Sequence, residues 1–167
     1  MDWETIAAAS EMVAALGVIV SLLYLARQVR SATDTARTST YQAVVADFGA
    51  LNRSMAESAD LSDLFIQAME DYDSLTPEER ARISQVIFVC FHNFENMYYQ
   101  YRKGYLEEDM WLGWKRMMLT YAARPGFQTY WKMRSSVFSQ SFVDFLATEK
   151  LDRPVMSYFD VTRFDVR

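Results

Sequence analysis

The chain opens with one long apolar segment, and its later segments alternate apolar and polar positions at helical spacing. From Ile6 to Ala26 the only charged residue is Glu11. A helix of about 20 residues, rising about 1.5 Å per residue, crosses a hydrocarbon core of about 30 Å. Residues 6–25 supply that length. The pattern therefore predicts an N-terminal transmembrane helix with its juxtamembrane arginines over residues 1–30.

The charges that flank this segment differ in sign on its two sides. Asp2 and Glu4 precede it, whereas Arg27, Arg30 and Arg37 follow it. Because Lys and Arg stay on the cytoplasmic side of a membrane, we expect the N-terminus outside and the C-terminal domain in the cytoplasm. The three arginines are then membrane-surface residues, and contact with anionic headgroups is worth about 1 kcal/mol each.

Two other interpretations of the segment stay open. A signal peptide needs basic residues before its apolar core and small residues at a cleavage site after it. Here the start is acidic, and "ARQVRS" follows the core. A buried helix of a soluble protein would also fit, because the segment is Ala-rich and carries Glu11.

Small residues of this segment share one side of the predicted helix. Such stripes let helix backbones approach closely in lipid, where packing drives association. Glu11 lies at the edge of the stripe, where it can hydrogen-bond between copies. We therefore expect a homo-oligomer that associates through the span. The alternative is that the small residues make no contact and that Glu11 reaches the membrane surface. The stripe consists of Ala7, Ser10, Ala14, Gly17 and Ser21.

Helical spacing continues through residues 31–150, which predicts an all-α fold with a helical cytoplasmic domain over this range. Residues 31–57 can extend the first helix, although their Thr and Ser content lowers helix propensity. The segment "LSDLFIQAMEDY" has the apolar spacing of a short amphipathic helix. Two further helices are expected from about 107 to 123 and from about 127 to 148. Residues 151–167 lack helical spacing, and we expect an extended tail that packs on its own domain or on a neighbour.

The clearest helix start is "LTPEERARI". Thr76 suits the N-cap, Pro77 suits the first helical position, and Glu79 completes a capping box. The helix is expected to end at Gly104, a favourable C-terminal residue. Its middle, "VIFVCF", is apolar all round, which indicates a central core helix with Cys90 as a small buried residue.

Three pieces of the chain are similar to a large group of uncharacterised bacterial single-span membrane proteins. They are "SEMVAALGVIVSLLYLARQVR", "NFENMYYQYRKGYLEEDMWLGW" and "RPGFQTYWKMRSSVFSQSFVDFL". The resemblance covers most of the chain. It implies a helix in the bacterial inner membrane and a small helical cytoplasmic domain, and it carries no activity and no catalytic residues.

The composition offers little chemistry. The net charge is −5, and Lys and Arg form no block outside residues 27–37, which argues against a nucleic-acid surface. The only histidine, His92, has Glu95 and Asn96 three and four residues further on. A carboxylate-bridged di-metal bundle needs two Glu-x-x-His pairs, so we expect no metal. No nucleophile with a nearby base, no phosphate-binding loop and no dinucleotide fingerprint occurs, so we expect no cofactor and no enzymatic activity.

These features favour a membrane-anchored homo-oligomer with a scaffolding or interaction role at the cytoplasmic face. One alternative is a small channel in which Ser10, Glu11 and Ser21 face a central opening. A second is a ligand-sensing domain that uses an aromatic cluster, although aromatics at helical spacing more often form core. That cluster is Tyr98, Tyr99, Tyr101, Trp111, Trp114 and Trp131.

Overall fold

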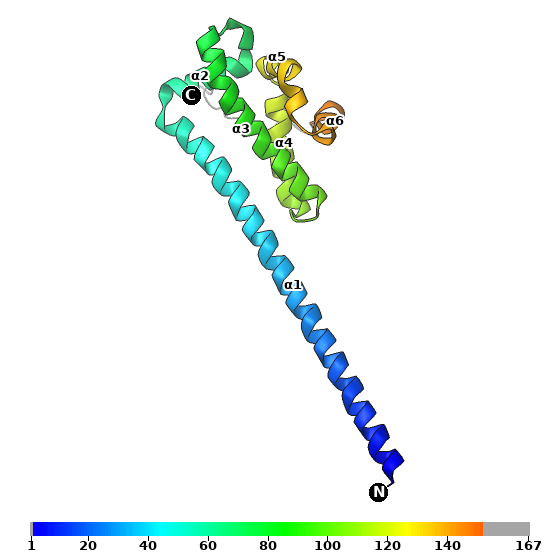
Figure 1. Ribbon diagram of the computed structural model, residues 1–167. Helices are drawn as coiled ribbons and strands as arrows, with labels where there is room; N and C mark the ends of the chain where they lie inside the picture. Colours follow the sequence, from blue (N-terminus) through cyan, green and yellow to red (C-terminus); the bar gives the residue numbers. More distant parts are fainter. Residues whose placement is uncertain (1, 152–167) are drawn as a thin grey trace, which may run out of the picture. The chain divides into compact units, whose positions relative to one another are not determined.

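The computed structural model describes residues 2–151, and this part of the chain consists of helices, turns and loops (Figure 1). The side chains of residues 4–10 are not among the described groups, and the predicted tail beyond residue 151 also lies outside the described residues. The all-α prediction is confirmed over this range. The chain divides into two compact units, Met1–Thr40 and Tyr41–Arg167.

Six α-helices and two short 3-10 helices make up the described chain. They are α1 (Trp3–Glu57), α2 (Ala59–Glu70), η1 (Tyr72–Ser74), α3 (Pro77–Arg102), α4 (Glu108–Ala122), α5 (Pro125–Arg134), η2 (Ser135–Val137) and α6 (Gln140–Thr148).

The predicted extension of the first helix through residues 31–57 is confirmed, because α1 ends at Glu57. Its Thr-rich part stays helical although it is mostly exposed. The hydroxyls of Thr33, Thr35 and Thr38 donate to the backbone carbonyls four residues earlier, at 2.9 to 3.1 Å. These bonds satisfy the hydroxyl donors within the helix itself.

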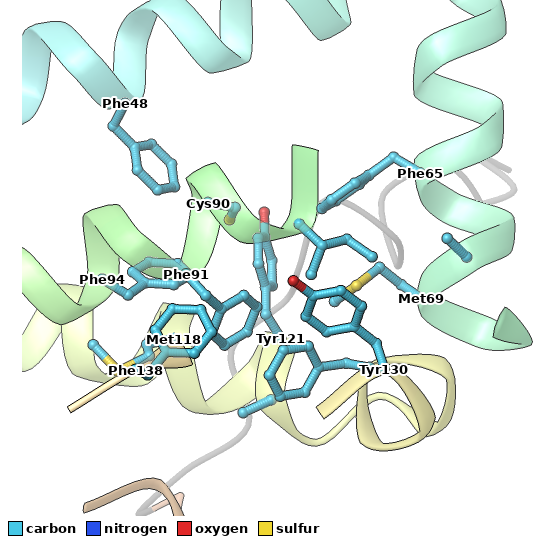
Figure 2. Close-up of a cluster of buried hydrophobic side chains, with 14 of the residues drawn as sticks. Phe48, Phe65, Met69, Cys90, Phe91, Phe94, Met118, Tyr121, Tyr130 and Phe138 are labelled. Atoms are coloured by element: carbon cyan, nitrogen blue, oxygen red, sulfur yellow. The ribbon is translucent and has the colours of Figure 1, made fainter. Parts of the chain in front are cut away.

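The core of the second unit forms around α3, as the apolar run predicted. Ile87, Phe91 and Phe94 of α3 are fully buried, and Figure 1 shows α2, α4, α5 and α6 beside α3. The end of α1 joins this core through Phe48, whose ring centroid lies 5.4 Å from that of Phe94 (Figure 2). Cys90 is 1% exposed, which confirms its prediction as a core residue.

The predicted boundaries of α3 are confirmed. Thr76 Oγ1 accepts a hydrogen bond from the Glu79 amide at 3.3 Å, and Glu79 Oε2 accepts one from the Thr76 amide at 2.8 Å. The helix ends at Arg102, and Gly104 follows with φ +73°. Only glycine adopts that left-handed conformation without strain.

The prediction of one last helix from about 127 to 148 is wrong. The chain forms α5, then η2, then α6, with a break before Gln140. Phe138 takes an extended conformation at the break and packs its ring 4.9 Å from that of Trp131. Glu95 Oε1 accepts a hydrogen bond from the Ser139 amide at 2.7 Å, which fixes the start of α6. These tertiary contacts override the helical spacing.

Candidate functional site

One helix in residues 2–151 is long and apolar enough to cross a membrane, and it is α1. Its apolar part has a mean hydropathy of 1.8, and none of this part is buried. The first unit holds only this helix, so within that unit these side chains have no other element to pack against. Within residues 11–25, eight aliphatic side chains are each more than half exposed. They are Val13, Leu16, Val18, Ile19, Val20, Leu22, Leu23 and Leu25.

The predicted association stripe lies on this helix. Glu11, Ala14, Gly17 and Ser21 are exposed, whereas the side chains of Ala7 and Ser10 are outside the described groups. Ser21 Oγ donates to the Gly17 carbonyl at 2.8 Å, which satisfies its donor inside the helix. A Cβ atom added at Gly17 would meet nothing within 4 Å. The fold of this helix therefore does not itself require a glycine there.

The three predicted membrane-surface arginines are exposed on α1. Arg27 and Arg30 are three residues apart, and Arg37 lies ten residues beyond Arg27. At about 1.5 Å per residue, Arg37 is about 15 Å further along the helix axis than Arg27. A headgroup layer is only about 5 to 8 Å deep on each side of the hydrocarbon. Arg27 and Arg30 can therefore occupy one headgroup layer, and Arg37 lies beyond it if the helix is upright.

His92 lies on the outward side of α3. Its side chain is 61% exposed, its Nδ1 lies 3.3 Å from Glu95 Oε2, and its ring stacks on Phe88 at 5.5 Å. Within residues 2–151, no group of three or more His, Cys, Asp or Glu side chains could hold a metal ion. His92 and Glu95 therefore form a polar pair on the outward side of α3.

Most of the predicted aromatic cluster packs into the core of the second unit. The rings of Tyr101 and Trp111 stack at 4.7 Å, and the ring of Trp114 meets that of Phe48 at 5.1 Å. Trp131 packs on Phe138. The ring of Tyr98 packs on that of Phe145 at 4.5 Å, whereas Tyr99 is exposed, and both tyrosines line a groove.

This groove has a volume of about 760 Å³ and follows the outward side of α3. We call it the α3 groove. Asp47 reaches it from α1, and Ser139 and Ser141 reach it from the start of α6. The remaining lining residues all come from α3 and the residue that follows it. They are His92, Asn93, Glu95, Asn96, Tyr98, Tyr99, Arg102 and Lys103.

The sequence analysis singled out His92, Glu95, Asn96 and the two tyrosines, but it missed the groove that contains them. The sequence contains one indication of the groove. Glu95 and Arg102 are seven residues apart and therefore share a side of the helix. The contributions of Asp47 and Ser139 come from distant parts of the chain and have no local signature.

No model of a known protein family, no curated protein and no solved structure matches this chain. The resemblance to bacterial single-span membrane proteins therefore stays a prediction, and the functional argument depends on the physical features of the two units.

Proposed function

We propose that the protein is a membrane-anchored, helical, homo-oligomeric protein with a scaffolding or interaction role at the cytoplasmic face of the bacterial inner membrane. The proposed span is residues 6–25 of α1, with the N-terminus outside and the second unit in the cytoplasm. The observation that carries the proposal is the long apolar part of α1, none of which is buried.

The eight exposed aliphatic side chains favour an apolar surrounding. Full burial of one such side chain is worth about 1.5 to 3 kcal/mol, and each is already partly covered by its own helix. A gain of roughly 1 kcal/mol each therefore remains, or about 8 kcal/mol in all. The side chains point to all sides of the helix, and a lipid bilayer covers all sides at once.

The homo-oligomer depends on the small stripe. Glycine inside a helix costs about 0.5 to 1 kcal/mol relative to alanine, and nothing in the described structure contacts a Cβ at Gly17. A neighbouring copy of α1 would explain the glycine at this position, because small residues let two helix backbones approach closely.

Membrane extraction tests the anchor. We expect the intact chain to stay in the membrane pellet after washing with alkaline carbonate and to require detergent for release. Recovery of a monodisperse, detergent-free chain from the high-speed supernatant would contradict the proposal.

Charge reversal tests the orientation. The double variant Arg27→Glu/Arg30→Glu removes the positive charge that follows the span, so we expect reporter fusions at the C-terminus to move to the outside in a fraction of molecules. The control Arg53→Glu/Lys132→Glu changes the net charge equally at exposed positions further from the span. It should keep the original orientation.

Adjacent substitutions test the stripe. Ala14→Leu adds bulk on the stripe, whereas Ala15→Leu adds the same bulk about 100° away around the helix. Sedimentation in detergent should show a smaller particle for Ala14→Leu only. Equal particle size for both variants would show that the stripe is no helix contact.

A further inference from the structure

The α3 groove carries opposite charges at its two ends. Glu95 lies at one end and Arg102 and Lys103 lie at the other. Glu95 and Arg102 are separated by two helical turns, which is about 10.5 Å along the axis of α3. Asp47 also lines the groove, and it precedes Phe48, whose ring lies 5.4 Å from that of Phe94.

The charged groups that line the groove differ in the partners that they already have. Glu95 already accepts the Ser139 amide and contacts His92. Arg102 lies over the ring of Tyr98 at 5.6 Å, and Lys103 lies over that of Tyr99 at 5.5 Å. Within the described residues, neither cation has a carboxylate partner.

We propose that the α3 groove binds a short, extended zwitterionic peptide of about three residues. An extended chain spans about 3.3 to 3.6 Å per residue, so three residues match the separation of the charged ends. The peptide ammonium lies at Glu95, and its carboxylate lies at Arg102 and Lys103. A purely anionic ligand would be repelled at the acidic end, and a volume of about 760 Å³ is ample for a tripeptide.

Calorimetry on the full-length protein in detergent micelles tests the proposal, with trialanine as the probe. We expect one peptide bound per chain. Trialanine that is both N-acetylated and C-amidated should lose at least tenfold in affinity, which is about 1.4 kcal/mol. Dialanine should also bind more weakly, because it cannot reach both charged ends.

Variants locate the binding site. Arg102→Gln/Lys103→Gln should weaken trialanine binding about tenfold and leave the weaker binding of C-amidated trialanine unchanged. The control Lys132→Gln/Lys150→Gln removes two exposed positive charges that do not line the groove, and it should bind like the wild type. Glu95→Gln, which keeps an oxygen acceptor for the Ser139 amide, should weaken trialanine binding and leave N-acetylated trialanine unaffected.

The proposal is overturned if trialanine gives no heat at millimolar concentration, if the doubly blocked peptide binds equally well, or if the control variant loses as much affinity as the groove variant.

Discussion

Gly126, near the start of α5, is the position at which one added methyl group tests the packing of the second unit most directly. A Cβ atom there would lie 2.0 Å from the Ala68 carbonyl oxygen and 2.8 Å from the Met69 carbonyl carbon. Both contacts are with the backbone of α2, so no side chain can rotate away. Gly126→Ala must therefore push α2 and α5 apart.

The size of the effect follows from that geometry. Restoring an ordinary contact of 3.4 Å to the Ala68 oxygen needs a displacement of about 1.4 Å. The two helices enclose Phe65, Met69 and Tyr130, each no more than 1% exposed (Figure 2). Overpacking of a core costs about 1 to 3 kcal/mol, and we expect the upper end because backbone must move. At roughly 4 °C per kcal/mol, the unfolding midpoint should fall by about 10 °C.

Thermal and chemical unfolding of full-length protein in detergent measure this effect, with Gly113→Ala as the control. Gly113 is exposed within α4, and an added Cβ there meets nothing within 4 Å. That variant should gain about 0.5 to 1 kcal/mol, because alanine favours the helix. If Gly126→Ala unfolds at or above the wild-type midpoint, α2 and α5 do not pack as closely as described.

Three further predictions concern single groups. The thiol of Cys90 should react with iodoacetamide only when the second unit unfolds, because it is buried and burial raises its pKa; rapid labelling of native protein, seen by mass spectrometry, would contradict this. Thr76→Ala should cost about 1 kcal/mol in denaturant unfolding, because it removes the N-cap acceptor, whereas Thr76→Ser should be nearly neutral. The hydrogen bond from the Thr76 amide lowers the pKa of Glu79, so its stabilising contribution is present above the ordinary glutamate pKa and is lost as pH falls through the lowered value. Glu79→Gln should therefore weaken the pH dependence of the unfolding free energy in that acidic range. An unchanged pH dependence would show that the Glu79 carboxylate is not its source.

The local elements of the second unit were largely predictable from the sequence. The capping box at Thr76 and Glu79 and the left-handed residue Gly104 depend on neighbours only three or four residues away. The end of the last helix at Thr148 was also predicted. Such signals work because the physical partners lie within the same helical turn.

The tertiary contacts were not predictable from local spacing. Pro125 starts α5, and Gly126 lies against the backbone of α2, a contact that has no local signature in the sequence. The break before α6 is set by the Glu95 carboxylate, which comes from a residue 44 positions earlier. Phe91 stacks on Phe127 at 3.9 Å, a contact between residues 36 positions apart in the chain.

The α3 groove shows why a site can be hidden in a sequence whose helices are readily predicted. The outward side of α3 has the polar composition of an ordinary solvated face. It becomes a groove because Phe48 holds the end of α1 against the core, and because Phe138 and Phe142 hold the start of α6 on the other side. Those aromatic contacts bring Asp47 and Ser139 to the groove. Substitutions that loosen this packing, such as Phe48→Ala, should therefore weaken peptide binding without changing any residue that lines the groove.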